Sequence, residues 1–200
     1  MRTIVRMEVN TKRKKDVIIV AQSLFRKKGY ESTSMRQLAK ELNLEVASLY
    51  SHIRSKSDLL EVICFGMADK FLLAAKEVND IYFNAEEKLR MYISNHVNLL
   101  TQNLDSSVVF LRDWRFLPET QKKQFISLRN HYEEGIKEMI QTGVSENIFN
   151  PSDVKMASLT ILSSLNWIVE WYNPAGKMSP PQIANQLADF ILNGLKKNNL

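Results

Sequence analysis

The sequence predicts an all-α protein, with a small N-terminal unit of three helices followed by a larger antiparallel helical bundle. Three observations favour this fold class. Apolar residues recur at intervals of three and four along most of the 200 residues. Gly (6) and Pro (5) are few for the many tight turns of a β-rich chain. Apolar residues make up 44% of the chain, which is enough to build a sizeable core.

The first third of the chain contains three compact helices and the start of a fourth. Apolar spacing predicts a helix over residues 11–28, which ends before a glycine. The hydroxyls of "YESTS" are suited to cap a second helix, and Asn43 ends that helix because Asn tolerates left-handed backbone. A third, short helix follows. A longer helix, capped by Ser55 or Ser57, then runs to about Asn79.

The rest of the chain consists of long apolar-periodic segments separated by breaks such as "LPET" and "NPAGKMSPP". Short connections favour antiparallel neighbours. We therefore expect a bundle with helices near 85–103, 106–117, 119–141, 152–172 and 180–196. We interpret the chain as a flexible N-terminal arm, a first domain and a second domain, at residues 1–10, 11–57 and 58–200.

Charge is distributed unevenly along the chain. Residues 1–60 carry 13 Lys and Arg against 6 Asp and Glu, whereas the remainder carries 14 against 16, so the net charge of +5 comes from the N-terminal part. A basic end on a slightly acidic body indicates that this end meets a polyanion. The alternative is a basic tail that is merely solvated.

The chain has a single cysteine, Cys64. An internal disulfide and a cysteine-based metal cluster are therefore excluded, and a reducing compartment fits. The longest apolar runs, such as "VIIVA" and "FLLAA", are far below membrane-spanning length, and no apolar signal segment follows the basic N-terminus. We expect a soluble cytoplasmic protein with no metal, no cofactor and no membrane partner.

The segment from Ser34 to Lys56 places two short helices on either side of the turn "NLE". This spacing is typical of a helix-turn-helix, whose second helix fits the major groove of DNA, although simple packing of a helical hairpin is an alternative. We expect Leu44 to be buried in the turn. The outer side chains and the neighbouring helix starts are placed to meet bases and phosphates. These candidates are Thr33, Ser34, Arg36, Glu45, Ala47, Ser48, Ser51, His52 and Lys56.

The stretch "AQSLFRKKGYESTSMRQLAKELNLEVASLYSHIRSKSDLL" resembles the DNA-binding domain of the TetR family of bacterial repressors, almost position by position. The matching motifs are "F...GY", "TS" and "LY.H...K". The resemblance implies a homodimer that binds a palindromic operator in double-stranded DNA. It further implies phosphate contacts from Tyr50, His52 and Lys56, with Ala47, Ser48 and Ser51 near the bases.

Three positions depart from that family's pattern. Asn43 stands where Gly is usual, which the turn tolerates. Ile53 replaces the usual Phe and changes only the shape of the core. Glu45 replaces the usual Ser or Thr cap of the recognition helix. We expect its carboxylate to cap poorly and to repel phosphate, which makes the operator affinity or preference unusual.

Aromatic residues in the C-terminal part predict a ligand cavity between helices. Trp167 and Trp171 share nearly one helical face, which Phe110, Trp114 and Phe125 could oppose; ordinary core or dimer packing is the alternative. We also expect small residues of the last two helices to allow close packing against a second copy, namely Ala157, Ala184, Ala188 and Gly194.

The segments "LNWIVEWYNPAGKMSP" and "ADFILNGL" resemble the branch of the TetR family that senses acyl-CoA thioesters. This resemblance implies an apolar cavity for the acyl group and a basic mouth for the CoA moiety. The candidates for that mouth are Arg112, Arg115, Lys122, Lys123 and Arg129.

We therefore predict a repressor that a small, largely apolar effector releases from DNA, with an acyl-CoA thioester as the candidate. An enzyme is disfavoured, because three histidines, one cysteine and no catalytic motif leave few acid, base and nucleophile arrangements. A helical adaptor that binds only protein, with a weak DNA-binding head, is the remaining alternative.

Overall fold

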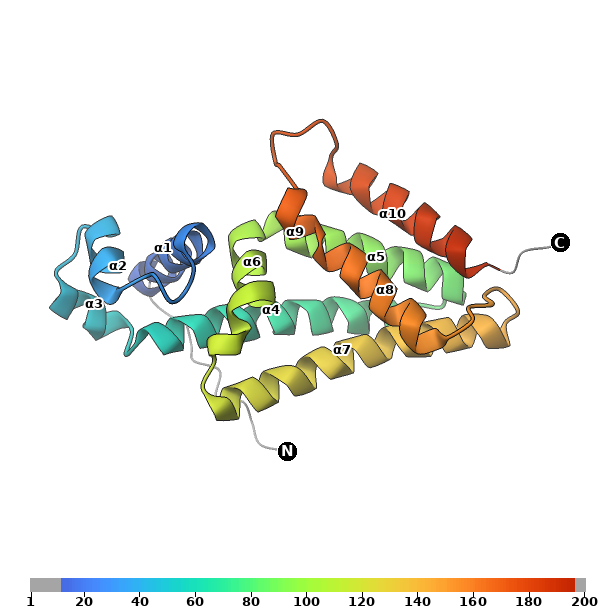
Figure 1. Ribbon diagram of the computed structural model, residues 1–200, viewed down its shortest axis with the longest axis horizontal. Helices are drawn as coiled ribbons and strands as arrows, with labels where there is room; N and C mark the ends of the chain where they lie inside the picture. The colour runs from blue at the N-terminus through green and yellow to red at the C-terminus, as the bar shows by residue number, and fades with distance from the viewer. Residues whose placement is uncertain (1–11, 197–200) are drawn as a thin grey trace.

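The computed structural model describes residues 12–196, and every regular element in that range is a helix (Figure 1). The predicted all-α class is confirmed. The arm predicted at residues 1–10 lies outside the described residues. The elements are α1 (Lys12–Lys28), α2 (Met35–Glu41), α3 (Val46–His52), α4 (Lys56–Asn79), α5 (Ala85–Gln102), α6 (Leu104–Arg112), the 3-10 helix η1 (Asp113–Phe116), α7 (Glu119–Ser145), α8 (Val154–Asn166), α9 (Ile168–Trp171) and α10 (Pro180–Leu195).

Local capping explains where the N-terminal helices begin and end. Gly29 has φ 86° and follows α1, so the left-handed stop lies where the sequence predicts it. At the start of α2 the Ser34 hydroxyl accepts a hydrogen bond from the Gln37 N–H, and the Gln37 side chain accepts one from the Ser34 N–H. Asn43 has φ 52° in the turn before α3, as predicted. Ser55, one of the two residues proposed, caps α4.

Two predicted helices are interrupted. The expected helix over 106–117 begins two residues earlier and tightens into η1 after Arg112. Leu117 ends η1 in extended backbone because it precedes Pro118. The expected helix over 152–172 is broken at Trp167, where the Glu170 N–H bonds to the carbonyl only three residues back.

Helix α7 is longer than predicted. The sequence predicts its end near residue 141, just before Gly143, but α7 continues to Ser145 and left-handed backbone occurs only at Asn147, with φ 60°. The absence of a side chain at Gly143 serves packing instead, because the ring of Phe149 occupies the space that a Cβ would fill. A glycine in a helical pattern can thus mark a close contact rather than a helix end.

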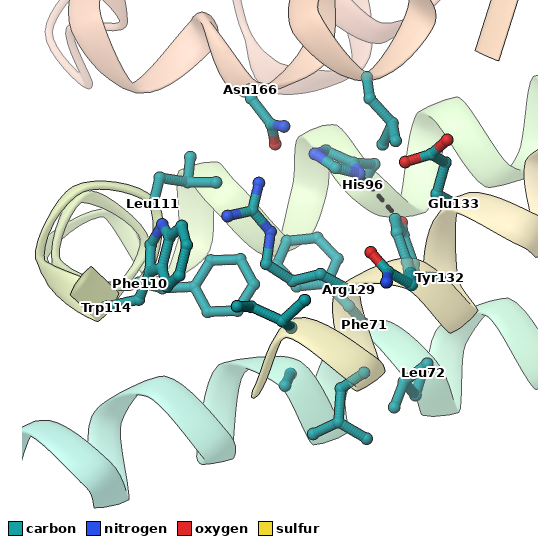
Figure 2. A pocket seen from close by; sticks show the side chains of 15 residues that line it. Phe71, Leu72, His96, Phe110, Leu111, Trp114, Arg129, Tyr132, Glu133 and Asn166 are labelled. Carbon is teal, nitrogen blue, oxygen red and sulfur yellow. Dashed lines mark hydrogen bonds between the residues drawn. The ribbon is translucent and has the colours of Figure 1, made fainter. Parts of the chain in front are cut away.

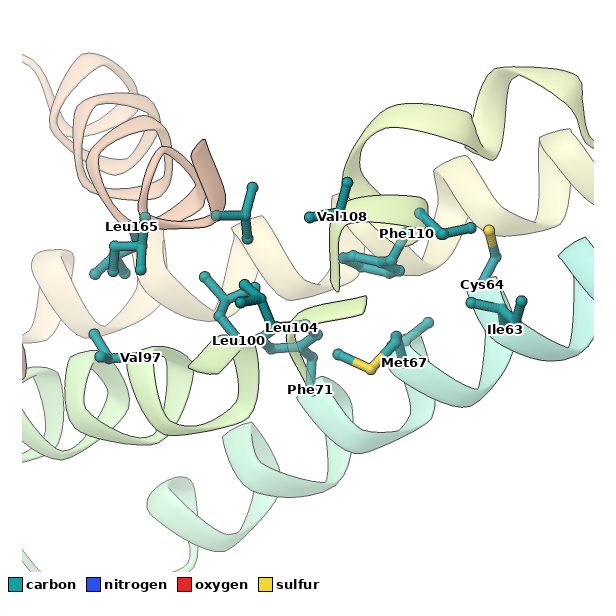
Figure 3. Close-up of a cluster of buried hydrophobic side chains, with 14 of the residues drawn as sticks. Ile63, Cys64, Met67, Phe71, Val97, Leu100, Leu104, Val108, Phe110 and Leu165 are labelled. Atoms are coloured by element: carbon teal, nitrogen blue, oxygen red, sulfur yellow. The ribbon is translucent and has the colours of Figure 1, made fainter. Parts of the chain in front are cut away.

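The small head formed by α1, α2 and α3 lies at one end of the molecule, and α4 runs from it along the bundle (Figure 1). Apolar residues of α4, α5, α6 and α8 meet in the core, including Phe71, Leu100, Phe110 and Leu165 (Figure 3). Burial in this core raises the pKa of the Cys64 thiol, with Asp113 acting in the same direction. No helix within residues 12–196 is long and apolar enough to cross a bilayer.

Helix α10 packs most extensively against α5. Ala184 and Ala188 are buried, so two of the small residues expected at a dimer contact are already used within the chain. Gly194 is exposed and Ala157 is partly buried against the core.

Candidate DNA-binding surface and ligand cavity

Helix α3 presents one apolar and one polar face. Leu49 (0% exposed) and Ile53 (2%) point into the head, and Leu44 in the turn is half-buried rather than fully buried. The opposite side carries the residues selected from the sequence, which are exposed or half-buried: Glu45, Ala47, Ser48, Tyr50, Ser51 and His52. Ser34 and Arg36 are exposed at the start of α2. The structure therefore leaves these side chains accessible, and their contacts with DNA stay a prediction.

Two predicted phosphate contacts need correction. Thr33 is 1% exposed and its hydroxyl donates to the Gly29 carbonyl, so its side chain closes the turn after α1 instead of reaching solvent. The Lys56 ammonium donates to the carbonyls of Tyr30, Glu31 and Thr33 at 3.0, 3.3 and 2.9 Å and lies 4.3 Å from the Tyr30 ring centroid. Its three N–H donors are thus engaged within the head, and Lys56 positions the turn between α1 and α2.

The start of α3 lacks a side-chain cap. Glu45 occupies the capping position in extended backbone, but its carboxylate makes no capping hydrogen bond. The amides in the first turn of α3 therefore lack the side-chain acceptor that Ser or Thr provides.

We expect Glu45→Ser to raise the free energy of unfolding by about 1 kcal/mol, because serine adds the missing cap. Operator affinity should also rise, because a negative charge beside the DNA phosphates is removed. Urea unfolding and a DNA titration measure the two effects. Glu45→Gln is the matched control, since it removes the charge without supplying a cap; a gain in stability from this variant as well would contradict the capping argument.

The head is joined to the bundle through α6 and η1. The Arg112 Nη2 donates to the Phe25 carbonyl at 2.6 Å, which lies in the last turns of α1, while the same guanidinium holds Asp113 through its Nε at 2.9 Å. Arg26 pairs with Asp105 of α6 at 2.7 Å. The ring of Phe116 stacks on Tyr30 with 5.5 Å between centroids. A displacement of α6 or η1 would therefore reach the head directly.

A cavity of about 270 Å³ lies between α4, α5, α6, α7 and α8, with Trp114 of η1 in its wall (Figure 2). One part of the wall is apolar and the other carries polar groups. Its lining residues are Ala68, Phe71, Leu72, His96, Phe110, Leu111, Trp114, Ile126, Leu128, Arg129, Asn130, Tyr132, Glu133, Leu162 and Asn166. Such a cavity suits a ligand with an apolar body and a few polar atoms.

The structure brings three of the predicted ligand residues to the cavity, Phe110, Trp114 and Arg129. Phe125 is 0% exposed and supports the wall from behind, with its ring 5.3 Å from Phe110. Arg115 is outside the lining but stacks on Trp114, as Arg129 does, each with its guanidinium carbon 5.0 Å from the ring centroid.

The prediction for Trp167 and Trp171 was wrong. They are 64% and 44% exposed and do not line the cavity. The predicted common helical face depends on a continuous helix, but the chain is broken at Trp167, between α8 and α9, and both side chains are exposed.

The polar end of the cavity was missed in the sequence. His96 is 2% exposed, and its Nδ1 lies 2.9 Å from the Tyr132 hydroxyl. Burial lowers the pKa of His96 to about 3, and the neighbouring Asn166 side chain acts in the opposite direction, although it forms no well-aligned hydrogen bond with Nε2. His96 stands at an apolar-face position of "YISNHVNLL", between Ile93 and Leu100, and that placement was the available signal.

Acid should destabilise the protein through His96. The unfolded imidazole takes up a proton below its ordinary pKa of 6.5, whereas the folded one stays neutral until about pH 3. The free energy of unfolding should therefore fall by up to about 1.4 kcal/mol for each pH unit between these values. Chemical unfolding at several pH values measures the slope. His96→Gln should show a shallower one, and identical slopes would contradict the assignment.

Comparison with known proteins agrees with this arrangement. The family model described as "Bacterial regulatory proteins, tetR family" matches residues 18–63, and "Tetracyclin repressor-like, C-terminal domain" matches residues 83–195. The HTH-type transcriptional repressor KstR2 of Mycobacterium tuberculosis is 22% identical over 196 residues, which cover 96% of this chain and 97% of KstR2.

Solved structures extend the comparison. The TetR-family regulator PfmR from Thermus thermophilus is 31% identical, with a TM-score of 0.82 over 90% of this chain and 99% of its own. The structure of KstR2 of M. tuberculosis is 21% identical, with a TM-score of 0.90 over 96% and 98%. AibR, solved with isovaleryl coenzyme A and operator DNA, is 24% identical, with a TM-score of 0.79 over 92% and 98%.

The helix-turn-helix head, its contacts with α6 and η1, and the matched family models define a helix-turn-helix transcriptional regulator rather than an enzyme. This chain belongs to the TetR family, whose members bind DNA operators, and it is a transcriptional repressor of that family.

Proposed function

We propose that this protein binds a palindromic operator as a homodimer and that an acyl-CoA thioester entering the cavity releases it. The observation that carries the proposal is the contact between α6 and the head. Helix α6 contributes Phe110 and Leu111 to the cavity, and its last residue, Arg112, is hydrogen-bonded to α1 of the head. A ligand that displaces α6 therefore changes the position of the DNA-binding helices. It must bind the displaced state more tightly than the DNA-bound one, because otherwise the equilibrium does not move.

The chemistry of the cavity supports an anionic ligand with an apolar end. Arg129 lines the cavity, and Arg115 contacts the same Trp114 ring; neither forms an ion pair with a carboxylate of residues 12–196. Burial, and after it the charge of Arg115, lower the pKa of Arg129, while Glu133 raises it. An anion beside both guanidinium groups would be stabilised. The complex of AibR with isovaleryl coenzyme A provides a related example.

The predicted basic mouth is reduced to fewer residues. Arg112 is occupied by the Phe25 carbonyl and Asp113. Arg115, Lys122, Lys123 and Arg129 are the remaining candidates for the CoA phosphates. A volume of about 270 Å³ lies at the lower end of the roughly 300–1,000 Å³ of pockets that hold drug-sized ligands, so we expect the acyl group inside the cavity and the larger CoA moiety at its mouth.

The proposed effector is tested by binding the purified protein to DNA from its own upstream region over a salt series, with and without a panel of acyl-CoA thioesters. We expect saturable binding that weakens with salt and release by at least one thioester, whereas free CoA, the matched ligand, should release nothing. Leu162→Trp, which fills the cavity from α8, should remove the response. Binding that no thioester releases would overturn the effector class, and no DNA binding at all would favour the adaptor alternative.

The proposed homodimer is supported by apolar side chains that stay exposed in the C-terminal part of the chain. They include Leu159 of α8, Trp167 between α8 and α9, and Phe190 of α10. A two-fold pair would present two α3 helices about one DNA turn apart, near 34 Å.

We expect Phe190→Lys to weaken dimerisation by roughly tenfold or more, because its 79% exposed ring becomes a charge in an apolar contact. Sedimentation velocity over a concentration series measures this. Tyr82→Lys, in the exposed connection between α4 and α5, is the matched control. Equal behaviour of the two variants would place the dimer contact elsewhere.

A further inference from the structure

Two unpartnered polar atoms face the same cavity. Among residues 12–196, three buried side-chain nitrogen or oxygen atoms have no hydrogen-bond partner: Asp58 Oδ2, His96 Nε2 and Trp114 Nε1. His96 and Trp114 both line the cavity. Buried polar groups in folded proteins are normally hydrogen-bonded, and the side chain of Asn166, in the same wall, is the neighbour of His96 that forms no well-aligned bond with it.

The contact with Tyr132 determines which ring nitrogen of His96 carries the proton. The Tyr132 hydroxyl lies 2.9 Å from Nδ1 and has the side chain of Tyr92 as its other hydrogen-bonding neighbour. With the phenol as the donor to Nδ1, the one hydrogen of the neutral imidazole lies on Nε2, which is then a donor. Burial keeps the ring neutral at physiological pH by lowering the pKa of His96 to about 3.

Nε2 is buried in the cavity wall, so a ligand oxygen reaches it when a neighbouring side chain of the wall shifts. In Figure 2 the ring of His96 turns one nitrogen toward Tyr132 and the other toward the side where Asn166 and Arg129 lie. The ring of Phe71 lies 4.7 Å from the imidazole and stacks on Phe110. A donor set among aromatic rings has little access to water, so an unmade hydrogen bond there is costly.

We propose that His96 is the specificity-determining residue of the cavity, because its Nε2–H donates to an oxygen acceptor on the acyl group of the effector. This inference rests on the proposed function for the location of the ligand. The acceptor is either the thioester carbonyl or an additional keto or hydroxyl oxygen. The indole N–H of Trp114 is a second donor in the same wall. A ligand with only hydrocarbon beside His96 would leave the Nε2–H unsatisfied and would bind weakly.

The tautomer is tested first and without any ligand. Protein labelled with ¹⁵N in its histidines is studied by NMR at neutral pH, and His96→Gln assigns the signal. We expect the tautomer with hydrogen on Nε2. Hydrogen on Nδ1 would overturn the proposal, because Nε2 would then accept a hydrogen bond rather than donate one. This result does not depend on the class of the effector.

The ligand preference is tested by calorimetry on the full chain with hexanoyl-CoA and its β-keto and β-hydroxy derivatives. We expect His96→Leu to weaken the preferred ligand about tenfold, equivalent to about 1.4 kcal/mol. His96→Gln should restore part of the loss, because its amide can donate from a similar position. Thermal melting checks that both variants fold.

Each pattern of affinities has a separate meaning. Equal weakening of all three ligands by His96→Leu identifies the thioester carbonyl as the acceptor, and weakening of the derivatives alone identifies the additional oxygen. Unchanged affinity for every ligand in His96→Leu overturns the role of His96 but leaves the effector class standing. Absence of binding to the unmodified protein overturns the acyl-CoA class, and with it the acyl-group acceptor, while the tautomer result remains valid.

Discussion

Replacing the residue that joins the cavity to the head should separate ligand binding from DNA release. We expect the double variant Arg112→Met with Asp113→Asn to bind the effector with unchanged affinity but to stay on the operator. The reason is that the guanidinium of Arg112, at the end of α6, is bonded to the Phe25 carbonyl of α1. Coupling free energies between two sites are typically about 1–3 kcal/mol, so the effector response should fall by roughly 5- to 150-fold.

The second substitution in that variant prevents a separate effect. Asp113 is 2% exposed and has Arg112 as its ion-pair partner. Removing Arg112 alone would leave a buried carboxylate unpaired, at a cost of about 2 kcal/mol. Asp113→Asn alone is the matched control, since it keeps the bond from Arg112 to α1 and should keep the response. Operator titrations with and without effector measure both variants, and a normal response of the double variant would show that coupling runs through another contact.

Placing a negative charge on the outer face of α3 should abolish operator binding without unfolding the head. Ala47 is exposed in the first turn of this helix. An acidic residue in a first turn stabilises the helix through its dipole, so Ala47→Asp should fold normally. The same carboxylate would face the DNA phosphates, and we expect affinity to fall by roughly 100-fold, or about 2.7 kcal/mol.

The size of the new side chain is controlled by Ala47→Asn, which has nearly the same shape as Ala47→Asp and no charge. We expect Ala47→Asn to lose less operator affinity than Ala47→Asp. The loss caused by Ala47→Asn should also depend less on salt concentration. Anisotropy titrations at several salt concentrations measure both. An equal loss from Asn and Asp would mean that the space is simply too small, and no loss from either would mean that this face of α3 does not meet DNA.

Local patterns were most informative in the head. Ser34, Gly29 and Asn43 begin or end their helices where the sequence predicts, because capping and left-handed backbone depend on a few neighbouring residues. Some roles could not be read locally. Lys56 has the charge of a phosphate ligand, yet the fold brings three carbonyls within its reach. Gly143 resembles a helix end, yet it makes room for Phe149.

The sequence by itself determined the all-α class, the order of the helices and the outer face of α3, because periodicity and capping act over one or two helical turns. Only the tertiary structure decided which side chains line the cavity. His96, Trp114, Arg129 and Asn166 come from four elements of the chain, and their meeting depends on how those elements pack. Periodicity shows which side chains share a face of one helix but not which neighbour that face meets. For this reason Trp167 and Trp171 are at the surface, while a single histidine on an apolar face lies at the centre of the proposed ligand site.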